Sequence, residues 1–247
     1  MNHELLKSII YDQHEVIRNA DIVSRPSYTF EANANYVLVG LRRAGKSTLL
    51  YKIVRNLIAG GVSWDQIIYI NFEDERLSEF RKEDLNDILS VQSELSSAQG
   101  YFFFDEIQIV PGWEKFCRRM ADARERVYVT GSNASMLSRE IATTLGGRYL
   151  TKYVTPYNFD EYLTALDIPH DSRALYQTKA NGRIRSHCAD YLQYGGFPEA
   201  LRYTARREYI SSVYQKILLG DIIARNGIRN DYAIRILMKK LAESVKS

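Results

Sequence analysis

The chain has 247 residues, 45% of them hydrophobic, which is enough to bury the core of one large domain or of a main domain with a smaller one. No run approaches the roughly eighteen apolar residues that cross a bilayer, and no basic segment followed by an apolar one marks a signal peptide, so we expect a cytoplasmic protein with no membrane partner. Two cysteines, Cys117 and Cys188, lack the spacing of a metal site and are expected to be reduced thiols.

The net charge of +3 is unevenly distributed along the chain. Residues 1–171 carry 19 Lys and Arg against 24 Asp and Glu, whereas residues 172–247 carry 14 against 6. The basic charge is therefore a property of the carboxyl-terminal part. Either a solvated helical surface or an acidic partner such as nucleic acid explains it.

Residues 5–19 place apolar side chains at helical spacing, which predicts an amphipathic helix. An apolar run at 36–39 then predicts a buried strand, and the residues that follow fit the P-loop pattern at every fixed position: Gly40-Leu41-Arg42-Arg43-Ala44-Gly45-Lys46-Ser47. A helix is predicted at 47–59. Together these elements predict a nucleotide-binding site, whereas an ordinary glycine turn requires neither the strand nor the helix.

The P-loop residues have distinct expected roles. The two glycines allow a tight turn that directs backbone N–H groups and a helix N-terminus at phosphates. Lys46 is expected to reach the outer phosphates, and the Ser47 hydroxyl to bind Mg²⁺, which prefers oxygen ligands. The residues expected to hold the nucleotide are Gly40, Arg43, Ala44, Gly45, Lys46, Ser47 and Thr48 and, from a later strand, Ser132.

An acidic motif follows a predicted strand at 66–72 and a predicted helix at 84–95. Four large apolar residues at 101–104 predict another buried strand, which ends in Asp105 and Glu106. In this Walker B arrangement, Asp105 completes the Mg²⁺ site and Glu106 polarises a water for attack on the γ-phosphate. Two exposed acids ending a strand are the plain alternative, which the buried run before them disfavours.

A helix at 112–124, a strand at 127–130, a helix at 134–145 and a strand at 149–154 complete an alternation that predicts an α/β fold with a parallel sheet covered on both faces. A strand lies between the P-loop and the acidic motif, which is the additional-strand layout. In P-loop proteins of this type the strand after the acidic motif, here 127–130, is inserted between the two motif strands, so we expect that arrangement. Ser132 or Asn133 would then sense the γ-phosphate, or either residue simply caps the next helix.

Several arginines are further candidates. Arg148 lies on a glycine turn and either acts as an arginine finger, in its own chain or from a neighbouring subunit, or is structural. Arg42 and Arg43 lie inside the P-loop, where one contacts phosphate or pairs with an acid such as Glu73 or Asp74.

Beyond residue 156 the strand signals fade, and helices are predicted at 159–166, 184–194, 206–224 and 232–245. We therefore expect two domains, a P-loop core with its amino-terminal helix over 1–155 and a smaller helical lid or linker domain over 156–247. The stretch 167–181 is predicted to be an exposed linker or loop.

Further motifs accompany the P-loop: Tyr69-Ile70-Asn71-Phe72-Glu73-Asp74-Glu75-Arg76-Leu77, Phe104-Asp105-Glu106-Ile107-Gln108, Pro111-Gly112-Trp113-Glu114, Thr130-Gly131-Ser132-Asn133, Gly147-Arg148, Pro156-Tyr157-Asn158-Phe159-Asp160-Glu161-Tyr162 and Tyr194-Gly195-Gly196-Phe197-Pro198-Glu199. With them the chain resembles the prokaryotic AAA+-superfamily P-loop ATPases that carry an AAA-type N-terminal domain and a C-terminal domain of unknown function.

This resemblance implies ATP rather than GTP, Mg²⁺, a five-stranded parallel core and a helical lid whose movement reports the nucleotide state. It also implies a winged-helix segment and a further domain beyond Ser247, where the sequence stops. Residues 22–26 either lie against the adenine base or only connect a helix to a strand.

The first functional hypothesis is an Mg²⁺-dependent ATPase that couples nucleotide state to motion of the lid or of a partner. The alternative is a nucleotide-gated regulatory or nucleic-acid-binding module with little or no turnover. A small-molecule kinase is disfavoured because no substrate pocket with a general base can be assigned. The expected partners are ATP and ADP, a second copy of the chain, and DNA or a protein bound through the basic carboxyl-terminal region or the further domain.

Overall fold

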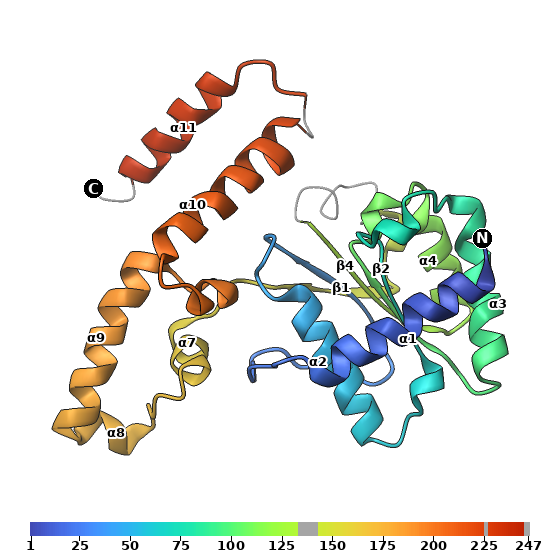
Figure 1. The fold of residues 1–247 in the computed structure, drawn as a ribbon, viewed down its shortest axis with the longest axis horizontal. Coiled ribbons are helices and arrows are strands. Elements are labelled where there is room, and N and C mark those ends of the chain that lie inside the picture. Colours follow the sequence, from blue (N-terminus) through green and yellow to red (C-terminus); the bar gives the residue numbers. More distant parts are fainter. Residues whose placement is uncertain (133–142, 225–226, 245–247) are drawn as a thin grey trace. The chain divides into compact units, whose positions relative to one another are not determined.

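The computed structural model describes residues 1–132, 143–224 and 227–244 (Figure 1). The chain divides into two compact units, Met1–Glu199 and Ala200–Ser247. The first unit contains a five-stranded sheet, and the second is helical in its described part. A domain boundary at residue 156 stays a prediction.

The sheet is fully parallel and has the strand order β2-β3-β4-β1-β5. Its strands are β1 (Asn35–Gly40), β2 (Ile67–Asn71), β3 (Tyr101–Asp105), β4 (Arg126–Ser132) and β5 (Tyr149–Tyr153). Strand β4 thus lies between β1, which leads into the P-loop, and β3, which leads into the acidic motif. The predictions of an α/β fold, a five-stranded parallel sheet and an inserted strand are confirmed.

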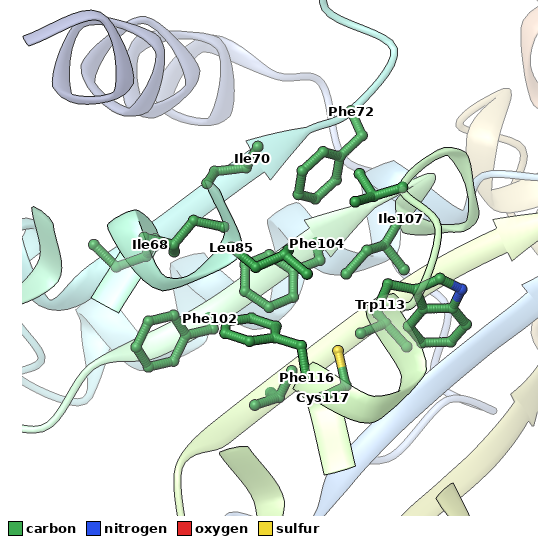
Figure 2. Packing of buried hydrophobic residues seen from close by; sticks show 14 of the residues in the cluster. Ile68, Ile70, Phe72, Leu85, Phe102, Phe104, Ile107, Trp113, Phe116 and Cys117 are labelled. Carbon is green, nitrogen blue, oxygen red and sulfur yellow. The ribbon is translucent and has the colours of Figure 1, made fainter. Parts of the chain in front are cut away.

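One face of the sheet is covered by α3 (Leu85–Leu95) and α4 (Trp113–Asp122). Alternate strand residues point to this side, among them Ile68, Ile70, Phe102 and Phe104, which lie with Phe116 of α4 in one apolar cluster (Figure 2). The opposite face packs on α2 (Lys46–Ala59), whose buried stripe is Leu49, Leu50, Ile53 and Val54. Helices therefore cover both faces, as the uninterrupted apolar strands required.

Helix α1 (His3–Asn19) protects the edge strand β2. Its residues join both clusters, because Leu6 packs on the α3 side of the sheet and Ile17 on the α2 side. Between them, buried His14 donates from Nε2 to the carbonyl oxygen of Ile67 at 2.8 Å, on the first residue of β2. The helix thus satisfies part of an edge that would otherwise expose unpaired backbone groups.

After β5 the described residues of the first unit form α7 (Phe159–Ala165), α8 (Ser172–Tyr176) and α9 (Thr178–Tyr194). The prediction of a loop over 167–181 is wrong, since α8 and the first turn of α9 lie there. Asp171 caps α8 by accepting from the Ala174 backbone N–H at 2.8 Å. The end of the predicted stretch, Asn181, lies in the first turn of α9.

The second unit contains α10 (Arg206–Lys216), which continues through the π-helical segment Ile217–Ala224, and α11 (Asp231–Ser244). These match the helices predicted at 206–224 and 232–245. Most of the helix predicted at 134–145 falls outside the described residues. Among the helices that are described, none combines the length and apolar character needed to cross a bilayer.

The two thiols are free, as predicted. Cys117 is fully buried in the cluster on the α4 side, where burial raises its pKa above the ordinary value for a thiol. It is therefore a core residue and not a nucleophile.

Candidate functional site

The predicted site lies where the carboxyl ends of β1, β3 and β4 meet. Gly40, the last residue of β1, is in register with Ser132, the last residue of β4, and Asp105 ends β3 on the other side of β4. Parallel strands bring their carboxyl ends to one edge, so the topology gathers motifs that are far apart in sequence.

The two P-loop glycines are required by the backbone geometry. A Cβ atom at Gly40 would lie 2.0 Å from the carbonyl oxygen of Val154, where the chain leaves β5. Gly45 has a φ of 95°, in the left-handed region, and immediately precedes α2. The loop therefore turns tightly into a helix N-terminus, the geometry that binds phosphate.

Lys46 and Glu106 join the P-loop to the acidic motif. Lys46 Nζ lies 3.4 Å from Glu106 Oε1, and the two residues are only 5% and 8% exposed. The ammonium also donates to the carbonyl oxygens of Gly40 and Leu41, each at 3.2 Å. A buried cation must be paired and hydrogen-bonded, and P-loop carbonyls with Glu106 meet that requirement here.

Asp105 is held from two sides. It is 3% exposed, and its Oδ2 atom accepts from the Tyr69 hydroxyl at 2.9 Å, while Oδ1 accepts a short hydrogen bond from the Thr130 hydroxyl. Burial, and then the nearby Asp105 carboxylate, raise the pKa of Tyr69 well above its ordinary value, so the phenol remains a donor. The carboxylate is thereby fixed in orientation.

Thr130 also positions the second acid, because its Oγ1 accepts from the Glu106 backbone N–H at 3.0 Å. Glu106 has a φ of 53° and a ψ of 38°, a left-handed conformation that is uncommon for a residue with a Cβ. The chain thus turns sharply after β3, and the fully buried Thr130 supports that turn.

The P-loop arginines are paired with acids from other segments. Arg42 Nη1 lies 2.8 Å from Glu73, one of the two acids predicted for such a pair, and Arg43 forms an ion pair with Glu199. Arg43 has a φ of 61°. Its predicted contact with nucleotide stays a prediction.

A small hollow that opens to solvent lies beside the start of α2. The P-loop side contributes Gly45, Thr48, Leu49 and Lys52, and the rest of the lining comes from Ile22, Val23, Arg25, Tyr157 and Pro198. Three residues of the stretch 22–26, namely Ile22, Val23 and Arg25, thus line this hollow, and a contact with the adenine base stays a prediction.

Arg25 is the residue that ties this wall to the P-loop. It is 4% exposed and pairs with Glu161 of α7 through two hydrogen bonds, of 3.0 Å and 2.9 Å. The same guanidinium donates to Ala44 in the P-loop at 3.1 Å and to Thr155 after β5 at 2.8 Å. Three segments therefore converge on one planar cation, which suits its fixed fork of donors.

Arg148 is not brought to this edge within the chain. Tyr149 pairs with Asn35, the first residue of β1, so Arg148 lies at the amino-terminal edge, about 16 Å along β1 from Gly40 at 3.3 Å per residue. It pairs there with Asp122 and donates to the carbonyl of Gly146 at 3.2 Å. This placement disfavours a finger acting in its own chain.

Four of the remaining predicted site residues lie at or beside the P-loop, and one lies outside the described residues. Ala44, Ser47 and Thr48 lie in the P-loop and the first turn of α2. The backbone of Ser132 lies beside Gly40, while Asn133 is outside the described residues.

Sequence reasoning assigned no individual role to four residues that hydrogen-bond to the predicted site residues or to one another: Arg25, Tyr69, Thr130 and Glu161. The spacing from Asn158 to Glu161 fits a capping box, which the structure contains, but nothing local points to a partner 136 residues away.

A sequence model of a protein family described as an AAA domain matches residues 32–163, more than half of the chain. Among curated proteins, an uncharacterized protein of Methanocaldococcus jannaschii is 32% identical over 237 residues, and the match covers 94% of this chain and 52% of the relative. An uncharacterized protein of Haemophilus influenzae is 30% identical over 213 residues, and the match covers 85% of this chain and 51% of the relative. The chain spans about half the length of these relatives.

Solved structures with similarity include the ORC1 protein of Aeropyrum pernix in complex with DNA, at 18% identity and a TM-score of 0.38, covering 85% of this chain and 65% of that one. AMPPCP-bound DnaA of Aquifex aeolicus has 14% identity and a TM-score of 0.37, and the match covers 89% of this chain and 70% of DnaA. The Hsp104–ADP complex of S. cerevisiae has 13% identity and a TM-score of 0.46, and the match covers 98% of this chain and 39% of the Hsp104 chain.

Proposed function

The chain belongs to the AAA domain family, and we propose that it binds ATP together with Mg²⁺ and hydrolyses the bond to the γ-phosphate. The observation that carries this proposal is the 3.4 Å contact between Lys46 Nζ and Glu106 Oε1. It unites the phosphate-binding loop and the acidic strand end in one buried site. A bound phosphate would replace Glu106 as the ion-pair partner of the Lys46 ammonium. Glu106 could then accept a proton from water.

The donor set supports Mg²⁺. Asp105 uses each carboxylate oxygen for one hydrogen bond, and a carboxylate has about four lone-pair sites, so acceptor capacity remains for a metal or a metal-bound water. With the Ser47 hydroxyl on the first turn of α2, it offers the hard oxygen ligands that Mg²⁺ prefers. The ion would neutralise charge on the phosphates.

The hollow beside α2 supports a place for the adenine base. It opens next to Gly45 and Thr48 in the phosphate-binding region, and apolar Ile22, Val23 and Leu49 contribute to its lining. Small-molecule sites are mostly apolar, with a few polar groups that fix the orientation of the ligand. Arg25 would then connect base, P-loop and the start of the helical region.

The proposal also includes a sensor of the γ-phosphate, an arginine finger and a motion that hydrolysis drives. Ser132 or Asn133 would sense the γ-phosphate from the end of β4, which ends beside the P-loop. Arg148 would serve as a finger in the site of a neighbouring copy, since its own site lies at the opposite edge of the sheet. Hydrolysis would move the helical region after β5 or a bound partner.

The test is ATP turnover by the purified chain with Mg²⁺, measured at two protein concentrations. Glu106→Gln is expected to retain ATP binding and to lose at least a hundredfold in kcat, since general-base catalysis is worth about 10²–10⁴. Glu83→Gln is the matched control, because Glu83 is an exposed acid paired only with its neighbour Lys82 in the described structure.

Equal turnover by the wild type and Glu106→Gln would refute the assignment. A specific activity that rises with protein concentration would support an oligomer and an Arg148 finger acting between subunits. An activity independent of concentration would count against both.

The alternative function is a nucleotide-gated module that binds nucleic acid with little turnover. The excess of basic residues over 172–247, 14 against 6 acidic ones, favours it. Anisotropy titrations with DNA and RNA at two salt concentrations distinguish the two, because phosphate contacts give a steep salt dependence. Turnover without nucleic-acid binding at low salt would remove the alternative.

A further inference from the structure

Gln108 contacts the residue assigned as the general base. It lies in the 3-10 turn Ile107–Ile109 that follows β3, and its Nε2 atom donates to Glu106 Oε2 at 2.5 Å. A charge-assisted hydrogen bond of this kind is stronger than one between neutral groups.

The two oxygens of the Glu106 carboxylate therefore have different partners. Oε1 faces the Lys46 ammonium at 3.4 Å, whereas Oε2 accepts from Gln108. When Lys46 engages phosphate, Oε1 loses its cation and becomes available to water, while the bond from Gln108 to Oε2 involves no group that the nucleotide needs. The carboxylate would keep its orientation while one oxygen changes partner.

The amide orientation of Gln108 follows from the same contact. With the amide reversed, its carbonyl oxygen would face Glu106 Oε2, and two acceptors would repel each other. In the observed orientation the Gln108 Oε1 atom is buried and has no hydrogen-bond partner in the described structure. An unpartnered buried acceptor is unfavourable, so the bond to Glu106 determines which way the amide points.

The turn at Glu106 is held by separate hydrogen bonds at its backbone and at its side chain. Its left-handed conformation sets the carboxylate on a sharp turn, where the backbone N–H is already used by Thr130. Gln108 is the residue in that turn that fixes the carboxylate itself.

We propose that Gln108 is the positioning residue for Glu106, holding Oε2 so that Oε1 receives the proton of the attacking water. This inference rests on the proposed hydrolytic function. Gln108 acts through Glu106 and forms no bond with the substrate, so its removal should lower kcat and leave ATP affinity in place.

The test compares Gln108→Met with the wild type in ATP turnover and in ATP binding. Methionine has nearly the same length and no donor, so we expect kcat to fall at least tenfold while KM and the ATP Kd change less than twofold. Gln193→Met is the matched control, since Gln193 is exposed on α9. Unchanged tryptophan fluorescence and thermal midpoint establish that the variant is folded.

A second comparison places Gln108→Met in the Glu106→Gln background. If Gln108 acts only through Glu106, the added substitution should lower the residual turnover less than twofold. The same tenfold loss in both backgrounds would overturn the positioning role, as would a Gln108→Met enzyme with wild-type kcat.

The failure of the proposed function has a different signature. In that case the wild type has no turnover, or Glu106→Gln retains it, and the role of Gln108 is refuted with it. If Glu106→Gln loses turnover and Gln108→Met does not, only the inference about Gln108 is wrong.

Discussion

Replacing Arg25 with methionine should destabilise the first compact unit by about 3 kcal/mol. The buried guanidinium donates twice to Glu161, once to Ala44 and once to Thr155, at 2.8–3.1 Å. Removing one partner of a buried ion pair typically costs about 3–5 kcal/mol, because the other charge remains buried. The lower end applies because Glu161 keeps the Asn158 backbone N–H as a donor at 3.1 Å.

The assay is urea unfolding followed by tryptophan fluorescence. The chain has two tryptophans, Trp64 and Trp113, and both lie in Met1–Glu199, so the signal reports that unit alone. Arg118→Met is the matched control, since Arg118 is exposed on α4 and should change the unfolding free energy by less than about 0.5 kcal/mol.

The double variant Arg25→Met with Glu161→Gln isolates the pair. Glu161→Gln removes the charge that Arg25→Met leaves buried and unpaired. The double variant should therefore lose less unfolding free energy than the sum of the two single variants, by about 1–3 kcal/mol. A loss below about 1 kcal/mol for Arg25→Met, or strict additivity in the double variant, would refute the view that this ion pair joins the three segments.

Two further substitutions test other contacts. Thr130→Val removes the hydroxyl that bonds Asp105 and the Glu106 backbone N–H, so it should lower the unfolding free energy by about 1–3 kcal/mol and also lower kcat. Thr130→Ser keeps the hydroxyl and should retain both stability and kcat. A valine variant as stable and active as the wild type would contradict this. Burial lowers the pKa of His14 below 6.5, so the unfolded chain binds the proton more tightly and stability should fall as the pH drops below 6.5. His14→Gln should remove up to about 1.4 kcal/mol per pH unit of that slope in urea unfolding, and an unchanged slope would exclude His14 as its source.

The sequence by itself determined the order of elements and the chemistry at the strand ends. The P-loop pattern, the acidic pair after β3 and the buried runs between them are local signals that residue types and spacing express directly. The position of β4 between β1 and β3 was also predicted, but from the known layout of P-loop proteins in which a strand lies between the two motifs.

The tertiary structure decided which side chains meet. The pair of Arg25 with Glu161 and the contact of Tyr69 with Asp105 join segments 136 and 36 residues apart, and no local pattern encodes such distances. Arg148 shows the same limit, because its glycine turn predicted a site residue while the register of β5 puts it at the far edge of the sheet.

Gln108 lies only two residues from Glu106 and belongs to the same motif, yet the sequence assigned it no role of its own. Its side chain contacts the carboxylate in a turn where Glu106 adopts a left-handed conformation, which is uncommon for a residue with a Cβ. Residue types and spacing thus predicted a nucleotide site at this edge, whereas the direction of each side chain there depended on backbone geometry and on contacts made only when the chain is folded.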